Sequence, residues 1–323
     1  MIANSNNPDW RPTASQSVLI ARAKMLANIR HFFSAKNVLE VDTPSLSRGT
    51  ITDIYLDALK SSYQNNQAEQ QLYLQTSPEF AMKRLLSAGS GSIFQICRAF
   101  RDDEIGRYHN PEFLMLEWYR VDFNHLQLMA EMDELLITIL DTKPADIISY
   151  QQLFIDTLKL DPLEASNSTL QTMVIEKANG PILDDRDELL HCLFAILIEP
   201  NLGSHKPVMV VDYPASQSSL ARLSIKDRRV AERFEVYYKG IELANGFHEL
   251  KDATEQRERF NQDNIQRKLL GKPQKPIDER FLSALESGLP DCAGVALGLD
   301  RLLMLKLNIK TIKEVMPFPM DRA

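Results

Sequence analysis

The first 75 residues change from a helical to an alternating pattern of apolar positions. Between residues 18 and 33 the apolar side chains fall three and four positions apart, which predicts a helix. The segment VLEVDTPSL at 38–46 then alternates like a strand until Pro44 interrupts it. Residues 61–71 are polar between two apolar runs and predict a hairpin loop.

Apolar runs and helical periodicity continue to residue 205. Strands are expected at 72–77, 92–100 and 113–123, and a helix with a proline in its first turn at 78–89. From about 125 to 205 the periodicity is mostly helical and is broken at prolines. We expect this segment to be a mostly helical insertion packed on one side of the protein.

The pattern in the second half of the chain predicts strands joined by a hairpin, followed by helices. The run VMVVDYP predicts a strand, and RFEVYYKGIELANGF at 233–247 predicts a hairpin with its turn at Lys239–Gly240. A polar helix at about 252–270 and a second helix precede the run GVALGLD at 294–300 and a final helix. Strands joined by hairpins, with helices outside them, predict an α+β fold: an antiparallel sheet flanked by helices, in a single domain over 1–323.

Composition excludes several classes of protein. The 323 residues are 44% hydrophobic and 25% charged, which is typical of a globular protein with a large core. Lys and Arg number 37 against 44 Asp and Glu, and the net charge of −7 argues against a surface that wraps a long nucleic acid. The longest apolar run, at 192–198, is far shorter than the roughly 20 residues of a membrane-spanning helix. With no secretory pattern and no disulfide or metal spacing among the three cysteines, we expect a cytoplasmic location without membrane contact.

Common nucleotide-binding and hydrolase motifs are missing. The 12 glycines form neither a GxGxxG fingerprint nor a GxxxxGK[ST] loop. His248–Glu249 begins like a zinc-protease motif but lacks the second histidine, and there is no GxSxG. Dehydrogenase and hydrolase functions are therefore disfavoured.

A charged segment, FRDDEIGRYHNPEF, lies between two predicted strands. Arg101 stands at the end of the apolar run before it, and Asn110–Pro111 fixes the return of the chain. The following strand carries Glu117 and Tyr119 two positions apart. A solvated hairpin tip is the ordinary interpretation of such a charge run. The functional alternative is a guanidinium held rigidly beside an adjustable loop, which suits a phosphate and a purine.

The predicted hairpin supplies a pair of carboxylates. With the turn at Lys239–Gly240, Tyr237 faces Glu242 and Glu235 faces Ala244, so the two glutamates share one face about 7 Å apart. Such a pair can hold magnesium together with substrate phosphates. A surface pair balanced by Lys239 and Arg233 is the alternative.

The strand after the turn leaves a question about its two faces. Strict alternation places Asn245, Phe247 and Glu249 opposite to the carboxylate pair. A bulge at Asn245–Gly246 would turn them back into the same cleft. The residues alone leave both arrangements open.

One face of the predicted strand GVALGLD is almost bare. Gly294, Ala296 and Gly298 alternate with larger residues, and Arg301 follows at the start of an apolar helix. Small residues let a ligand approach the backbone, whereas tight packing of the helix on the strand would explain them equally well. The arginine favours the ligand, because it suits a phosphate or stacking on adenine.

These segments, in this order, resemble the signature motifs of the class II aminoacyl-tRNA synthetases. VLEVDTPSL resembles motif 1, FRDDEIGRYHNPEF motif 2 and GVALGLDRLLML motif 3, and TSPEF, RYHNPEF, ELANGFHEL and GLDRLLML are similar to the lysyl enzyme. The resemblance extends from about Ala21 to Arg322. Because motif 1 begins only some 38 residues into the chain, we expect a catalytic domain without the N-terminal anticodon-binding domain.

Within this class, GRYHNPEFLMLEWY and VYYKGIELANGFHEL resemble a family of stand-alone paralogues of the lysyl enzyme. That family uses ATP to activate lysine, preferably (R)-β-lysine, as an aminoacyl adenylate and attaches it to a lysine side chain of elongation factor P. The resemblance implies the same AMP-forming ligase activity, a homodimer formed through the motif 1 region, and poor charging of transfer RNA.

The resemblance also implies which residues contact ATP. It places Arg101 on the α-phosphate, the adenine between Phe113 and Arg301, and magnesium on Glu235 and Glu242. The full ATP set is Arg101, Asp102, Asp103, Asn110, Phe113, Glu242, Leu243, Gly298 and Arg301, of which Arg101 and Arg301 are the implied catalytic residues.

A second set of residues is implied for the amino acid. Ser77, Glu79 and Glu117 would surround the backbone-end amine, Asn245 the carboxylate, and Glu249 with Tyr119 the far ammonium. The full set is Ser77, Pro78, Glu79, Glu117, Tyr119, Asn245, Glu249 and Ala296. Lysine carries two ammonium groups, and a cleft with three carboxylates can match both.

Two positions depart from the pattern of the family. Motif 2 normally contains Arg-x-Glu, but residue 103 is Asp. The resemblance therefore leaves open whether Asp103 or Glu104 makes the contact of the motif 2 glutamate. Ala296 stands where lysyl-tRNA synthetases have glycine.

Three other functions fit parts of the pattern. A truncated lysyl-tRNA synthetase would share every active-site residue. A non-catalytic paralogue that senses lysine would have lost ATP contacts, yet Arg101, Glu242 and Arg301 are present. An asparagine synthetase of this fold would need basic groups where Glu249 stands. The acceptor protein is implied by the resemblance alone.

Overall fold

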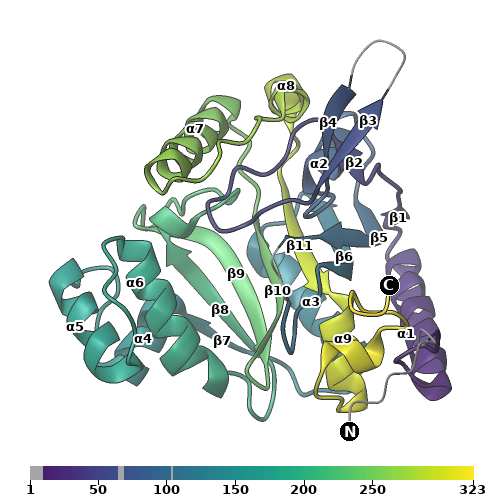
Figure 1. Cartoon of the computed structure of the whole chain (residues 1–323), viewed down its shortest axis with the longest axis horizontal. Helices are drawn as coiled ribbons and strands as arrows, with labels where there is room; N and C mark the ends of the chain where they lie inside the picture. The colour runs from purple at the N-terminus through teal and green to yellow at the C-terminus, as the bar shows by residue number, and fades with distance from the viewer. Residues whose placement is uncertain (1–9, 65–68, 103–104) are drawn as a thin grey trace, which may run out of the picture.

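A large, mostly antiparallel sheet forms the centre of the protein. The structure is a computed structural model that describes residues 10–64, 69–102 and 105–323. Over these residues the main sheet has eight strands in the order β1-β5-β6-β11-β10-β9-β8-β7, and only the pairs at its two edges, β1–β5 and β7–β8, are parallel. A three-stranded sheet with the order β2-β4-β3 lies beside it (Figure 1). The predicted α+β fold with an antiparallel sheet and flanking helices is confirmed.

The elements have the following bounds. The strands are β1 (Leu39–Glu40), β2 (Leu46–Ser47), β3 (Lys60–Gln64), β4 (Glu69–Leu74), β5 (Ile93–Phe100), β6 (Glu112–Val121), β7 (Asp146–Ser149), β8 (Val208–Pro214), β9 (Val230–Tyr238), β10 (Ile241–His248) and β11 (Cys292–Gly298). The α-helices are α1 (Gln16–Ala35), α2 (Glu79–Ser87), α3 (His125–Leu140), α4 (Tyr150–Leu158), α5 (Asn167–Ala178), α6 (Arg186–Leu193), α7 (Ala253–Leu269), α8 (Glu279–Gly288) and α9 (Leu299–Leu307).

Two of the predicted elements near the N-terminus are wrong in extent. The strand expected from residue 38 to Pro44 pairs only at β1, and pairing resumes at β2 beyond Pro44, which has no amide hydrogen for a ladder. The polar segment 61–71 belongs largely to β3 and β4, and only 65–68 between these strands lies outside the described residues. Its side chains are mostly exposed, so the segment lacks the apolar alternation by which a half-buried strand is recognised.

The mostly helical segment 125–205 contains one strand and belongs to two parts of the core. Its strand β7 forms an edge of the main sheet and was not expected from the sequence. Helix α3 packs in the same core cluster as α1 and α9, whereas α4, α5 and α6 form a separate cluster on β8. The segment 125–205 therefore does not form a core of its own, because α3 shares a core with α1 and α9.

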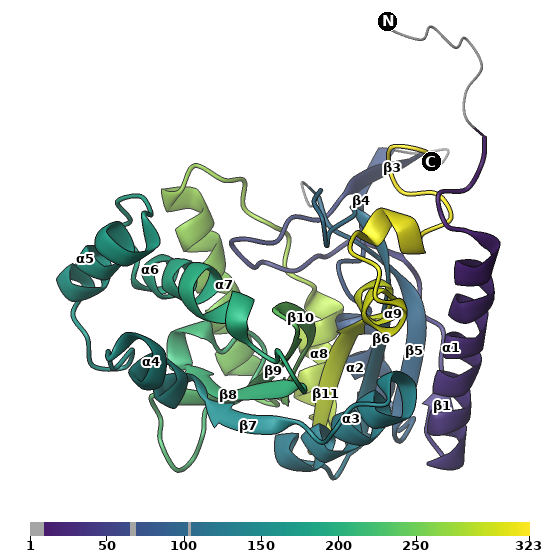
Figure 2. The same ribbon diagram turned by 90° about the horizontal axis from the view of Figure 1, so that it is seen from below.

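Helices cover the two faces of the main sheet differently. On one face α1, α3 and α9 pack against the central strands (Figure 2). On the other face α2, α7 and α8 cover one end, through residues such as Met82, Phe260 and Phe281. Figure 1 shows α1 and the α4–α6 group at opposite ends of the sheet. No described helix has the length and apolar character needed to span a bilayer.

Candidate active site

A bulge in β10 brings the predicted site residues onto one face of the sheet. The register shifts between Glu242 and Ala244, so Glu242 faces Tyr237 as predicted, but Glu235 faces Asn245 and not Ala244. The bulge therefore lies two residues before the predicted position at Asn245–Gly246. The extra residue lets Leu243 and Ala244 both enter the core on the far face. Asn245 and the alternating residues after it then share a face with Glu242.

The turn of this hairpin is where the sequence predicts it. Tyr238 pairs with Ile241, and Lys239 and Gly240 have φ values of 53° and 68°. Positive φ at both central positions is the geometry of a two-residue type I′ turn. The predicted diagonal relation of Glu235 and Glu242 is confirmed, since Tyr237 lies opposite Glu242 and two residues from Glu235.

A row of side chains crosses four strands at the middle of the sheet. Glu117 of β6 pairs with Ala296 of β11, Ala296 pairs with Asn245 of β10, and Asn245 pairs with Glu235 of β9. Directly opposite residues of antiparallel strands point to the same side. Ala296 is thus flanked by Glu117 and Asn245, and it is only partly buried.

Lys83 lies at the centre of the predicted amino-acid site, although it was not predicted to be a site residue. Its Nζ is 2.6 Å from Glu79 Oε1 and 2.5 Å from Glu249 Oε2, and its side chain is fully buried. Ser77 Oγ donates to Glu117 Oε2 at 2.6 Å, and Tyr119 Oη donates to Glu117 Oε1 at 2.6 Å. The structure therefore brings together Ser77, Pro78 at the N-cap of α2, Glu79, Glu117, Tyr119 and Glu249.

The charges in this cluster do not balance. Three carboxyl groups, on Glu79, Glu117 and Glu249, surround one ammonium. Burial, with repulsion from Glu79, raises the pKa of Glu117 to about 7. Burial, only partly opposed by Lys83, raises the pKa of Glu249 to about 8. Burial would lower the pKa of Lys83, but attraction to Glu249 and Glu79 outweighs it and raises the pKa above its usual value. The cluster therefore favours an additional cation.

Gly294 makes room for this cluster. A Cβ atom at Gly294 would lie 2.3 Å from Tyr119 Cε1 and 2.5 Å from Glu249 Oε1. Neither distance is compatible with van der Waals contact. At Gly298, on the same strand, a Cβ would be 3.8 Å from both Arg301 Cδ and the Leu243 carbonyl oxygen, which is ordinary contact. The bare face of β11 is thus tightly packed at Gly294 and less crowded at Gly298.

Glu235 accepts hydrogen bonds from several donors. Tyr213 Oη donates to its Oε2 at 2.6 Å, and Tyr237 Oη donates to the same oxygen. Arg233 donates to Oε1 at 2.6 Å, and Asn245 Nδ2 lies 3.4 Å from that oxygen. Both oxygens are engaged, so Glu235 holds Asn245 in place, while its predicted role as a magnesium ligand stays a prediction.

The two predicted catalytic arginines lie at the other end of the same face. Arg101 has its guanidinium 5.1 Å from the centre of the Phe113 ring. Arg301 donates to the carbonyl oxygens of Glu242, at 2.7 Å, and Tyr108, at 3.2 Å. Its NH1 is also 3.8 Å from the Glu242 carboxylate. Arg301 thereby joins the loop after Arg101 to the hairpin.

Some residues of the predicted ATP set have structural partners. Asn110 is buried, donates to the carbonyl of Glu112 at 2.6 Å and accepts from the amide of Met320 at 3.0 Å. These bonds hold the end of the loop. The exposed Asp102 donates its amide to the Asp57 carbonyl at 2.8 Å. Asp103 and Glu104 lie outside the described residues, so the question between them stays open.

Sequence reasoning missed residues that the site depends on. Lys83 follows Glu79 by four positions on α2, and this helical spacing was the one available signal. Arg233, considered only as a balancing surface charge, donates to Asn245 Oδ1 at 3.2 Å and to Glu235. Glu199 has its pKa raised to about 7 by burial and by Glu242. Asp300 accepts from Arg22 of α1 at 2.7 Å and from the Leu114 amide at 2.7 Å, which fixes the start of α9 against β6.

The comparisons with known proteins agree with this geometry. A family model described as tRNA synthetases class II (D, K and N) matches residues 3–322. The chain is 52% identical over 324 residues to a protein of Edwardsiella ictaluri (strain 93-146) named elongation factor P--(R)-beta-lysine ligase, and the match covers 99% of this chain and 100% of the relative. A protein of Salmonella typhi with the same name has the same identity and coverage. The resemblance expected from the sequence motifs is confirmed: the chain belongs to the class II tRNA synthetases of the D, K and N group.

Proposed function

We propose that this chain is an ATP-dependent ligase that joins lysine, preferably (R)-β-lysine, to a lysine side chain of elongation factor P. In the first step the carboxylate of the amino acid attacks the α-phosphorus of ATP, and pyrophosphate leaves. In the second step the acceptor amine attacks the carbonyl of the adenylate, an amide bond forms, and AMP leaves. Proximity and charge stabilisation carry both steps, without a covalent enzyme intermediate.

The observation that carries this proposal is the excess of carboxyl groups around Lys83. A neutral or acidic amino acid would bring only its backbone-end ammonium, and with Lys83 this gives two ammonium groups for the three carboxyl groups of Glu79, Glu117 and Glu249. Lysine and β-lysine each bring two ammonium groups, which would stabilise the ionised carboxylates whose pKa burial has raised. An aspartate side chain would add a fourth carboxylate to a cluster that contains one basic residue, Lys83, so the asparagine synthetase alternative is disfavoured.

The nucleotide end supports an enzyme over a lysine sensor. Arg101, Phe113 and Arg301 line one open end of the face, beside Gly298 and the Leu243 carbonyl. This arrangement suits a purine and its phosphates. The names of the two relatives describe a ligase that uses elongation factor P and (R)-β-lysine, and their full-length match extends that description to this chain as a proposal.

The donor set near Arg301 fits magnesium. Burial and repulsion from Glu235 raise the pKa of Glu242, and burial with Glu242 raises the pKa of Glu199. Carboxylates that repel one another are stabilised by a hard cation. Glu242, with Glu235 as its predicted companion, would hold the ion, which supplies neutralisation of phosphate charge when bound.

We also propose a cytoplasmic homodimer. The support is the exposure of apolar residues on two neighbouring elements: Leu39 of the edge strand β1 is 55% exposed, and Ile20 of α1 is 49% exposed. Exposed apolar residues at the edge of a sheet are a typical place for association of two subunits.

The proposed function is tested in two reactions. The first is lysine-dependent exchange of labelled pyrophosphate into ATP, and replacing Arg101 by Ala should slow it about 10²- to 10³-fold because a preorganised donor is lost. The second is transfer of labelled β-lysine, in parallel, to purified elongation factor P and to lysine transfer RNA. Labelled protein and unlabelled RNA are expected. Efficient labelling of the RNA without the protein would instead establish the truncated synthetase.

A further inference from the structure

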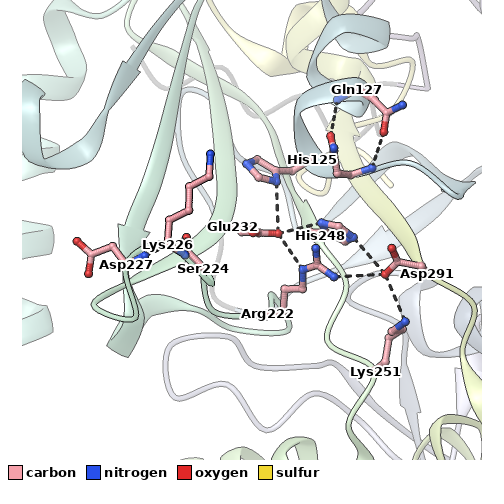
Figure 3. Close-up of polar contacts among 11 residues, drawn as sticks. His125, Gln127, Arg222, Ser224, Lys226, Asp227, Glu232, His248, Lys251 and Asp291 are labelled. Carbon is pink, nitrogen blue, oxygen red and sulfur yellow. Dashed lines mark hydrogen bonds and ion pairs between the residues drawn. The ribbon is translucent and has the colours of Figure 1, made fainter.

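A cluster of two histidines and a glutamate lies on the face of the sheet opposite to the active site. His125 is the first residue of α3, Glu232 belongs to β9 and His248 to β10. Glu232 and His248 alternate along their strands with Arg233 and Glu249, which face the active site. Figure 3 shows the two imidazole rings converging on the glutamate.

The surroundings of both histidines disfavour the charged imidazolium form. Burial lowers the pKa of His125 to about 4, and burial, followed by the charge of Arg222, lowers the pKa of His248. A neutral imidazole has one N–H, yet each ring nitrogen of His248 faces a carboxylate. Its Nδ1 lies 2.9 Å from Glu232 Oε2, and its Nε2 lies 3.3 Å from Asp291 Oδ1. Only one of these two contacts can therefore be an N–H hydrogen bond from a neutral ring.

The geometry places the proton of His248 on Nε2. The contact from Nε2 to Asp291 has hydrogen-bond geometry, whereas Nδ1 is buried and makes no hydrogen bond within the described part of the chain. The Nδ1 of His125 is likewise buried, lacks a hydrogen bond to any described residue and lies 3.6 Å from the same Glu232 oxygen. Both Nδ1 atoms thus approach the same carboxylate oxygen, and one nitrogen of each ring and an oxygen of Glu232 all lie within 4.8 Å of one another.

We propose that His125, Glu232 and His248 form a site for a transition-metal ion of the Zn²⁺ type, with water as the fourth ligand. Zinc with bonds of about 2.0–2.1 Å in a tetrahedron needs ligand atoms about 3.3 Å apart, which a small rotation of the His125 ring would supply. Asp291 acts as the carboxylate that orients a metal-binding histidine through its other nitrogen. The ion would fasten α3 to the hairpin that carries the substrate residues on its other face.

The surrounding charges select the kind of metal. Arg222 Nε is 2.8 Å from Glu232, and Arg222 NH1 and Lys251 Nζ are 3.3 and 3.4 Å from Asp291. Lys226 adds a further positive charge near His125. These cations balance the carboxylates, so the site does not attract Mg²⁺ or Ca²⁺, which rely on anionic oxygen ligands. Imidazole nitrogens bind zinc and cobalt in spite of such neighbours.

Cobalt(II) is the probe for this site, because its visible absorption is strong in tetrahedral coordination and weak in the octahedral oxygen coordination expected at the ATP site. Full-length protein stripped with a chelator should bind one equivalent of Co²⁺ with the tetrahedral spectrum, Zn²⁺ should displace it, and a large excess of Mg²⁺ should not. His125→Gln should abolish the signal, and His205→Gln, at an exposed histidine outside the cluster, should retain it.

Two further variants distinguish metal binding from a plain hydrogen-bond cluster. Asp291→Asn should weaken Co²⁺ binding about 10- to 100-fold, as expected for loss of an orienting carboxylate. Arg222→Gln should tighten it, because a cation beside the site is removed. Zn²⁺ should also raise the Tm of the wild-type protein and not that of His125→Gln. Absence of the tetrahedral spectrum in the wild-type protein, or an equal spectrum in His125→Gln, would overturn the proposal.

Discussion

At the scale of single residues, the raised pKa values of Glu117 and Glu249 connect substrate binding with pH. Their pKa values of about 7 and about 8 mean that both carboxyls are partly protonated in the free protein near neutral pH. An ammonium binds the ionised form, so binding of lysine must displace protons. The proposed substrate is therefore bound more tightly as the pH rises.

Lysine affinity should increase between pH 6 and about 8.5 and then level off. Glu249→Gln should weaken binding at pH 8 by about 30-fold or more, since loss of one partner in a buried ion pair costs about 2 kcal/mol or more. Titration calorimetry with lysine over this range measures both effects. Glu134→Gln, at an exposed ion pair with Lys36, serves as the control. An affinity independent of pH in the wild-type protein would contradict the assignment.

The same pKa values predict the sign of a stability effect. Because the pKa of both groups lies above the ordinary value of 4.5, the folded protein binds more protons than the unfolded chain. This contribution is fully present below about pH 4.5 and is lost as the pH rises through 7 and 8. The urea midpoint of the ligand-free protein should therefore fall between pH 6 and 8.5, with a smaller fall in Glu249→Gln. A midpoint that rises over this range in parallel for both proteins would show that these carboxyls are not the cause.

Ala296 is placed to influence the choice between lysine isomers. Its methyl group lies between Glu117 and Asn245, the predicted partners of the amine and the carboxylate of the substrate. The α- and β-isomers differ in the distance between those two groups. Ala296→Gly should raise kcat/KM for α-lysine relative to β-lysine about 10- to 200-fold, since one methyl in a pocket contributes about 1 to 3 kcal/mol. An unchanged ratio, with both substrates slowed alike, would show that the methyl only packs the strand.

At the scale of elements, β10 and β11 show how the site is built. The bulge at Leu243 changes the parity of β10, so polar residues on both sides of it reach one face while two apolar residues enter the core. Strand β11 contributes almost no side chains to that face. Its glycines leave the space that the neighbouring strands fill.

Gly294→Ala and Gly298→Ala form a matched pair on β11. The added methyl at Gly294 would overlap Tyr119 and Glu249, whereas the one at Gly298 would make ordinary contacts. Overpacking of this kind typically destabilises by about 1 to 3 kcal/mol. Gly294→Ala should lower the free energy of unfolding by about that amount and impair lysine binding. Gly298→Ala should fold with nearly wild-type stability. Denaturant unfolding measures the stability of both variants. Equal stability of the two would contradict this account of β11.

At the scale of the whole molecule, the two edges of the main sheet carry the prediction of a dimer. Both edge strands expose an apolar residue: Leu39 on β1 is 55% exposed and Ile147 on β7 is 61% exposed. The motif 1 region predicts that only the β1 edge associates. Light scattering should give a dimer for the wild-type protein and for Ile147→Lys, and a shift toward monomer for Leu39→Lys. A wild-type monomer at micromolar concentration would refute the dimer, and dissociation by Ile147→Lys alone would move the interface to the other edge.

The fold class, the position of the hairpin turn and the family can all be predicted from the sequence alone. These depend on local information: the period of apolar residues, a Lys-Gly turn that needs positive φ, and short segments whose order is preserved. Most of the residues expected at the amino-acid site also lie together in the structure, from Ser77 to Glu249.

Features that depend on pairing between strands and on burial are visible only in the folded protein. The bulge at Leu243 is set by register against β9, and polar strands such as β3 carry no apolar period that reveals them. Lysine is usually found at the protein surface. Only the packing of α2 against the sheet makes Lys83 a buried cation between two glutamates. The convergence of His125 with Glu232 and His248 likewise joins a residue to two others more than 100 positions away, a distance over which periodicity in the chain carries no information.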